Sequence, residues 1–362
     1  MLSDKNMQEQ NKVLLSSGWQ KQACMAGLLI LLLASFICSI GIGTTALAKK
    51  DIIYVILEKI ARFSPAKSIT DTTRDIVFNI RLPRVILAAV VGASLSVAGT
   101  TFQGIFRNPL ADPYIIGVSS GAALGATLAI VSGLSMGWAG FGAVSIMAFA
   151  GGVLTIMLVY QLSRQGNFVP VMTLLLAGIA TNAFLSAFVS LLIYFAGERL
   201  HQVVFWMMGG LGGARWSYVH IMLPYFFLGF GVIYYFAREL NALLLGEDTA
   251  QYLGIDAEKF KKVFLVAASL LVSAAVSTSG IIGFIGLVVP HIIRLVAGPD
   301  HRFLLPASAL TGAVLLLGAD TLARTIIAPA ELPVGIITAL LGAPFFLYLL
   351  RRRKKIRYFS GI

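Results

Sequence analysis

Charged residues are scarce in this chain of 362 residues. Only 12% of its residues are Asp, Glu, Lys or Arg, whereas 58% are hydrophobic, and a soluble domain usually carries about 25% charged residues. The chain therefore lacks the side chains that would cover a water-facing surface of ordinary size. Its formal charge of +12 would point to nucleic acid in a soluble protein. Here much of that charge lies in short loops and tails, which indicates that the basic residues orient the chain in a membrane. We therefore expect no nucleic-acid partner.

Signatures of catalysis and cofactor binding are also missing. The two cysteines, Cys24 and Cys38, have a spacing that fits no metal or redox motif. The four histidines do not form an HExxH pattern, and neither a GxxxxGK[ST] loop nor any Gly-Lys dipeptide occurs. We therefore expect this chain to bind no metal and no cofactor and to carry no catalytic residue. If an ATP-driven process uses it, another polypeptide must hold the nucleotide.

Long apolar stretches dominate what is present. Roughly ten of them, each close to the length of about 20 residues that a helix needs to cross a bilayer, run from Ala23 to Leu350. The strict alternation of barrel strands is absent. The sequence therefore predicts an all-α polytopic membrane protein with about ten transmembrane helices. The predicted spans are 23–47, 82–105, 114–133, 139–162, 169–196, 217–237, 260–279, 281–297, 303–323 and 333–350, and one broken helix with a re-entrant turn is an alternative around Gly280.

Basic residues orient these spans. An even number of spans places both termini on the same side, and the basic run that follows the last span marks this side as cytoplasmic. The outer segment 49–84 is an exception, because it is rich in Lys and Arg, and a use for Arg81 and Arg84 at the membrane entry is therefore predicted. The predicted parts are a cytoplasmic tail (1–22), a single transmembrane domain (23–350) with a long cytoplasmic loop (238–262), and a basic cytoplasmic tail (351–362).

The cytoplasmic loop 238–262 has a regular pattern. Apolar residues alternate with acids on both sides of a central Gly246, which predicts two short amphipathic helices with a turn between them. They are too short and too charged to cross a membrane. The loop is either a solvated connector or a docking surface for a cytoplasmic partner.

Small residues mark the third predicted span for close packing. Gly117, Gly121 and Gly125 form a GxxxGxxxG ridge, and small residues four apart let helix backbones approach closely in lipid. We expect this helix to be packed deep in a bundle, and a seam between two copies is the alternative.

Ionisable groups are rare at the centres of the spans. Carriers coupled to protons or sodium usually place acids or histidines there. Asp320 and Arg324 are four residues apart near an outer end, so they can pair along one helix face. A path lined by small neutral residues suits a bulky solute. An ion-coupled secondary transporter and a membrane-embedded enzyme remain alternatives that these residues do not favour.

Several short strings, taken in order, resemble one protein family. From about Ile80 to Leu350 the chain resembles the permease subunits of type II ABC importers for iron-siderophores, cobalamin and haem. The matching strings are RLPR (81–84), GTTFQG (99–104), NPLADP (108–113), GVSSGA (117–122), WMMGG (206–210), LGE (245–247), GFIGLVVPH (283–291), DHR (300–302), ELPVG (331–335) and LGAP (341–344).

The resemblance implies a function and a set of partners. A ten-helix subunit of this family pairs with a second copy of itself in the cytoplasmic membrane of a prokaryote, although pairing with a paralogous permease is also open. Two cytoplasmic ATPase subunits, which hold ATP and Mg, dock beneath it, and an extracytoplasmic binding protein delivers the substrate. The expected activity is import of a metal chelate, with a ferric siderophore favoured and cobalamin or haem as alternatives. The permease itself performs no chemistry.

The resemblance also implies roles for individual residues. Outward arginines receive acidic residues of the binding protein: Arg81, Arg84 and Arg324. Coupling helices seat in the ATPase through Leu243, Leu244, Leu245, Gly246, Glu247, Ala250, Leu253 and Gly254. A cytoplasmic gate is formed by Asn108 and Leu110, with a second constriction at Val169, Pro170, Val171 and Met172. Related chains can have hydroxyl residues at the second constriction, so we expect a more apolar gate here.

Overall fold

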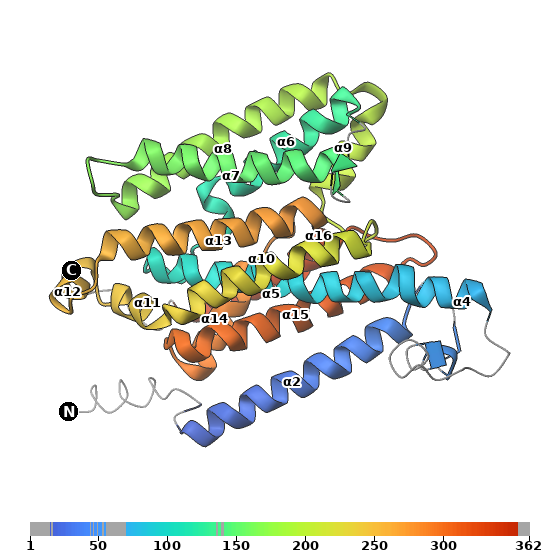
Figure 1. Cartoon of the computed structure of the whole chain (residues 1–362), viewed down its shortest axis with the longest axis horizontal. Helices are drawn as coiled ribbons and strands as arrows, with labels where there is room; N and C mark the ends of the chain where they lie inside the picture. Colours follow the sequence, from blue (N-terminus) through green and yellow to red (C-terminus); the bar gives the residue numbers. More distant parts are fainter. Residues whose placement is uncertain are drawn as a thin grey trace.

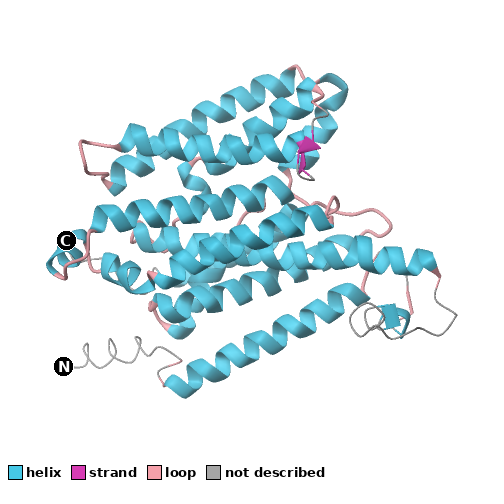
Figure 2. Cartoon of the chain, in the orientation of Figure 1, coloured by secondary structure: helices cyan, strands magenta, loops and turns pink. Residues whose placement is uncertain are grey.

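The computed structural model of the chain is almost entirely helical (Figures 1 and 2). It describes residues 15, 17–43, 45, 47, 48, 50–52, 54, 55, 70–134, 137, 138 and 141–353. Within these residues the only strands are β1 (Gly137–Trp138) and β2 (Phe141–Gly142), which pair antiparallel as a very short hairpin. Most of the predicted N-terminal tail, much of segment 49–84, and the basic tail beyond Arg353 lie outside the described residues.

Each predicted apolar stretch contains a helix. These helices are α2 (Gly18–Gly41), α5 (Leu82–Ile105), α6 (Val118–Ser132), α7 (Ala143–Ser163), α8 (Val171–Tyr194), α10 (Trp216–Tyr235), α13 (Ala257–Ser279), α14 (Ile285–Ala297), α15 (His301–Thr325) and α16 (Val334–Arg353). The shorter helices are α4 (Asp71–Asp75), η1 (Ile76–Arg81), η2 (Pro113–Ile116), η3 (Gly197–Arg199), α9 (Leu200–Met207), α11 (Ala237–Leu244) and α12 (Glu247–Tyr252).

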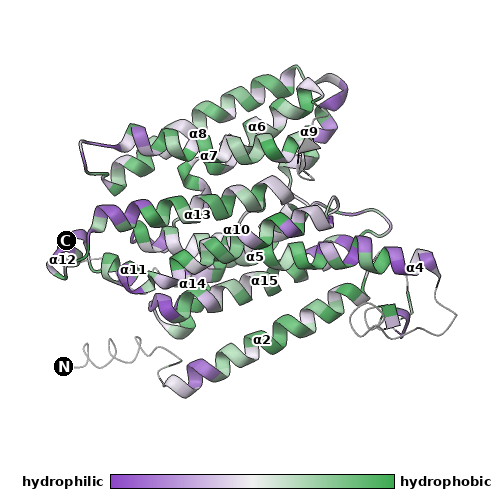
Figure 3. Ribbon diagram, viewed as in Figure 1, coloured by the Kyte–Doolittle hydropathy of each residue, from purple (hydrophilic) through white to green (hydrophobic). Residues whose placement is uncertain are grey.

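The helices form one bundle with a polar zone at each end. In Figure 1, α11 and α12 lie at the left end of the bundle and α4 lies at the right end. Figure 3 shows hydrophilic residues concentrated towards these two ends and mostly hydrophobic residues between them. Among the described residues, seven helical segments are long and apolar enough to cross a membrane, and three shorter apolar helices accompany them. The all-α polytopic membrane architecture is therefore confirmed.

Burial separates inner helices from peripheral ones. The most apolar window of the continuous helical segment Asp71–Ile105, which includes α5, is 83% buried, and that of α13 is 72% buried. The corresponding window of α2 is only 11% buried, and those of α8 and α10 are 17% buried. The large apolar side chains on these outer helices therefore face lipid or another protein.

The glycines of α6 permit its close approach to α7. A Cβ atom at Gly121 would overlap the carbonyl oxygen of Gly151, and one at Gly125 would overlap the carbonyl oxygen of Met147. Gly117 has a different task, because it precedes the helix with φ 87°, in the left-handed region that favours glycine. Two positions of the predicted ridge thus lie at the α6–α7 contact.

The chain breaks its helix at Gly280. Helix α13 ends at Ser279, Gly280 has φ 66°, and α14 begins at Ile285. The two elements are separate helices, which fits both two spans and a broken helix with a re-entrant turn. Helix α14 has only 13 residues, so it extends for about 20 Å, less than the thickness of the hydrocarbon core.

Candidate functional site

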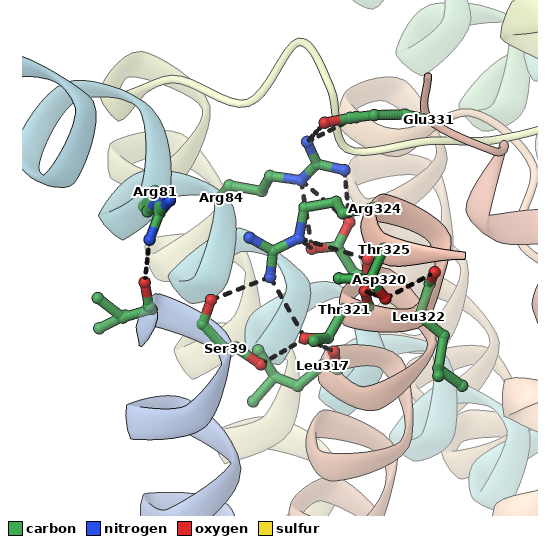
Figure 4. A network of polar contacts seen from close by, with 11 residues as sticks. Ser39, Arg81, Arg84, Leu317, Asp320, Thr321, Leu322, Arg324, Thr325 and Glu331 are labelled. Atoms are coloured by element: carbon green, nitrogen blue, oxygen red, sulfur yellow. Dashed lines mark hydrogen bonds and ion pairs between the residues drawn. The ribbon is translucent and has the colours of Figure 1, made fainter. Parts of the chain in front are cut away.

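An arginine cluster lies at the end of the bundle where α5 begins and α15 ends (Figure 4). Its centre is Arg84, which makes two salt bridges with residues far away in the chain. The Arg84 Nη2 atom lies 2.9 Å from Oδ1 of Asp320 on α15, and its Nη1 atom lies 2.8 Å from Oε2 of Glu331 in the loop before α16. The guanidinium fork is thereby shared between two carboxylates, a geometry that suits arginine.

Two further arginines connect this cluster to α2. Arg324 Nε lies 3.2 Å from Oδ2 of Asp320, which confirms the predicted pairing of these two residues along one face of α15. Arg324 Nη2 also donates to the carbonyl oxygen of Ser39, and Arg81 Nη1 donates to that of Ile40 at 2.8 Å. The cluster therefore holds α2, α5 and α15 together.

The three arginines predicted to receive a binding protein are thus brought together, but they are buried. Arg81, Arg84 and Arg324 are 4%, 6% and 3% exposed, and each has acceptors within its own chain. Two carboxylates face three guanidinium groups, so the cluster keeps one surplus positive charge. Glu331 is its most accessible acid, with a side chain that is 35% exposed. The docking role of these arginines stays a prediction.

The opposite end of the bundle carries the predicted pair of short helices. Helices α11 and α12 are present, and Gly246 between them has φ 110°, which explains why the turn contains glycine. Leu243 and Ala250 are buried against the bundle. Other large apolar side chains point to solvent: Leu245 is 66% exposed, Leu253 is 61% exposed and Tyr252, which the sequence interpretation did not include, is 92% exposed.

Asn241 fixes α11 to the start of α15. Its Nδ2 atom donates to Oδ1 of Asp300 at 2.7 Å, and its Oδ1 atom accepts the His301 backbone N–H at 2.9 Å. Burial raises the pKa of Asp300, but the hydrogen bonds from Asn241 and the Arg302 N–H, with the charges of Arg302 and Lys21, lower that pKa to a net value below the ordinary range. Sequence reasoning missed Asn241, since its partners are about 60 residues away.

The predicted gate residues lie in two places, the loop after α5 and the segment where the loop before α8 enters α8. Asn108 is exposed in the loop after α5, where its Oδ1 atom accepts the backbone N–H of Leu110 at 3.0 Å. Val169 is buried in the loop before α8, whereas Met172, the second residue of α8, is 69% exposed. Of these constriction residues, Met172 and Asn108 are therefore the exposed ones, and the gate role stays a prediction.

No metal centre emerges in the part of the chain that the structure describes. No group of three or more His, Cys, Asp or Glu residues there is placed to hold a metal ion. The two ends of the bundle instead offer contact surfaces, which long helices join.

The chain is similar to known membrane transport proteins. Residues 31–352 match the FecCD transport family. The chain is 49% identical to the cobalamin import system permease protein BtuC of Halobacterium salinarum, over 79% of this chain and 76% of the relative. It is 48% identical to the hemin transport system permease protein HmuU of Yersinia pestis, over 80% and 87% of the two chains. It is 39% identical to the iron(3+)-hydroxamate import system permease protein FhuB of Bacillus subtilis, over 91% and 83%.

A solved structure has the same fold. It is described as an inward-facing conformation of a metal-chelate type ABC transporter, and it superposes with a TM-score of 0.78 at 34% sequence identity. The superposition covers 91% of this chain and 98% of the other.

Proposed function

Because the chain belongs to the FecCD transport family, we propose that it is the membrane permease subunit of an ATP-driven importer of metal chelates. It is a multi-pass protein of the cytoplasmic membrane, in agreement with its seven long apolar helices. The names of its relatives, which are permeases for cobalamin, hemin and iron(3+)-hydroxamate, support this class of cargo. All three cargoes are bulky metal chelates.

Two copies of the chain form the path, with ten spans in each copy and both termini in the cytoplasm. Peripheral helix α8 supports this proposal, because it leaves large apolar side chains such as Phe184 and Phe188 exposed and its most apolar window is only 17% buried. A second copy of the chain covers such an exposed apolar surface. A heterodimer with a paralogous permease is the alternative.

Partner proteins act at the two polar ends. Two ATPase subunits bind the exposed apolar residues of α11 and α12, and an extracytoplasmic binding protein approaches the arginine cluster. The surplus positive charge of that cluster attracts acidic residues on the binding protein and orients its approach. Arg84 already holds Asp320 and Glu331, so a docking carboxylate has to compete with the accessible Glu331.

Transport follows from alternation between two conformations of similar free energy. ATP binding draws the ATPase subunits together, α11 and α12 follow, and the loops at Asn108 and Val169 open or close the cytoplasmic end. ATP binding shifts the populations only because the two conformations differ in their affinity for the closed ATPase pair. ATP hydrolysis takes place on the partner subunits, and this chain supplies no reacting group.

The cargo within this class is tested separately. The proposed cargo is a ferric siderophore, with cobalamin and haem as alternatives. Uptake of a labelled ferric hydroxamate by proteoliposomes that contain the whole importer is expected, and unlabelled cobalamin or haem should not compete with it. Competition by either one would assign the cargo to that chelate.

The observation that carries the proposal is the exposed apolar surface at the cytoplasmic end, formed by Leu245, Tyr252 and Leu253. Replacing Tyr252 and Leu253 together by Asp should abolish co-purification of the ATPase and ATP-driven uptake, while the amount of permease in the membrane stays unchanged. Asp248→Asn, an exposed polar change on the same helix, is the matched control. Uptake that survives the double substitution, or uphill accumulation by the permease alone in liposomes, would refute the proposal.

A further inference from the structure

Lys261 is a buried cation without a role in the transport mechanism described above. It lies in the second turn of α13 and is only 5% exposed. A buried ammonium group is costly unless charged or polar partners surround it. The identity of its partners therefore indicates what this residue does.

The partners of Lys261 come from three elements. Its Nζ atom donates to Oε2 of Glu247, the first residue of α12, at 2.9 Å, and to the carbonyl oxygen of Val169, in the loop before α8, at 3.0 Å. It also forms an ion pair with Glu258 on α13 itself. An ammonium group has three N–H donors, so these three contacts employ its full capacity.

The Val169 backbone is held from both sides. Its carbonyl oxygen accepts from Lys261, and its N–H donates to Oε2 of Glu258 at 3.1 Å. The Lys261 ammonium also lies 4.8 Å from the centre of the Phe168 ring. Two reciprocal backbone hydrogen bonds between Gln165 and Phe168 close the turn that comes before Val169. The loop therefore joins α13 as one compact unit.

The position of this loop determines where α8 begins. Val169 is followed by Pro170, and the Pro170 carbonyl oxygen accepts the N–H of Leu174 in the first turn of α8. A displacement of Val169 therefore carries the start of α8 with it. Met172, which lies in that first turn, is the exposed residue of the predicted constriction.

We propose that Lys261 is a positioning residue that ties α12 to the loop 165–170, so that a movement of α12 reaches the cytoplasmic entrance of α8 directly. The role of this link in transport rests on the proposed function, because α12 is there the contact for the ATPase. The link itself does not depend on it. Glu247 contacts Lys261, and Lys261 in turn contacts Val169, so a change at Glu247 tests the link without replacing a residue of the loop.

Hydrogen–deuterium exchange in the complete permease–ATPase complex measures the link. In Glu247→Gln and in Lys261→Gln, the amides of 164–169 should exchange at least about tenfold faster than in the wild type, because the Lys261 ammonium loses a charged partner in the first variant and is itself removed in the second. Lys259→Gln, an exposed change on the same helix, should leave the exchange rate unchanged. An unchanged rate in Glu247→Gln would overturn the proposal.

The molecules of cargo imported per ATP hydrolysed measure the consequence for transport. Lys261→Gln should lower this ratio by about tenfold with little change in ATP hydrolysis, and Lys261→Arg, which keeps the charge and the donors, should restore most of it. A ratio that stays at the wild-type value would overturn the coupling role. If the wild-type complex shows no ATP-dependent uptake at all, the proposed function fails, while the exchange experiment still decides whether the link exists.

Discussion

Asp320 is the residue on which the arginine cluster depends most strongly. Its side chain is 1% exposed, it accepts from the guanidinium of Arg84 at 2.9 Å, and it lies 3.2 Å from that of Arg324. Asp320→Asn keeps the shape and removes the charge. It leaves two buried guanidinium groups facing each other without the carboxylate between them, and only Arg84 keeps another acid, Glu331.

The size of the effect follows from burial. Removing one partner of a buried ion pair typically costs about 3–5 kcal/mol, because the remaining charge is left uncompensated. Glu331→Gln serves as the matched control, since the Glu331 side chain is 35% exposed and an exposed pair contributes only about 0–1 kcal/mol. We therefore expect Asp320→Asn to reduce the free energy of unfolding by several times more than Glu331→Gln does.

The assay is equilibrium unfolding in mixed micelles, followed by helical circular dichroism as the denaturing detergent increases. The double variant Arg84→Met with Asp320→Asn should be less destabilised than the sum of the two single changes, because both changes remove the same Arg84–Asp320 ion pair. A loss below about 1 kcal/mol for Asp320→Asn, or one equal to that of Glu331→Gln, would refute the reasoning.

Two further predictions concern other parts of the molecule. Gly121→Ala should destabilise the fold by about 1–3 kcal/mol, since its Cβ meets the backbone of α7. The control is Gly27→Ala in α2, where a Cβ has open space, so this change should be neutral or stabilising in the same assay. Equal effects of the two substitutions would contradict the packing argument. Because the folded pKa of Asp300 is lowered, the stability that this carboxylate contributes is fully present above its unfolded pKa of about 3.9 and is lost as the pH falls through the lower folded value. The difference in unfolding free energy between the wild type and Asp300→Asn should therefore be constant between about pH 7 and 5 and decrease below about pH 4; a difference that does not change with pH would exclude this role.

Lipid as a solvent made much of the fold predictable. A backbone inside hydrocarbon must satisfy its own hydrogen bonds, so long apolar stretches have to become helices. Helix α5 has the predicted bounds, Leu82–Ile105, and most of the others differ from prediction by a few residues. Helices α11 and α12 were predictable for a related reason, because their amphipathic pattern repeats within a few residues on both sides of Gly246.

The same locality limits what could be predicted about the sites. The pair Asp320–Arg324 was predictable because residues four apart share a helix face. The partners of Arg84 were not, since Asp320 and Glu331 are 236 and 247 residues away. Similarly, the pattern in loop 238–262 indicated a surface, but it did not separate the buried Leu243 from the exposed Leu245 and Leu253.

Sequence alone therefore determined the solvent, the helices and the family of this protein, because hydropathy, helical period and motif strings are properties of neighbouring residues. Tertiary structure alone decided which charges from distant parts of the chain neutralise one another. Arg84 meets Asp320, and Lys261 meets Val169, only after the helices have packed. Burying a charge is unfavourable without a partner, so the packed bundle brings acids such as Asp320 and Glu331 from distant segments to the buried Arg84.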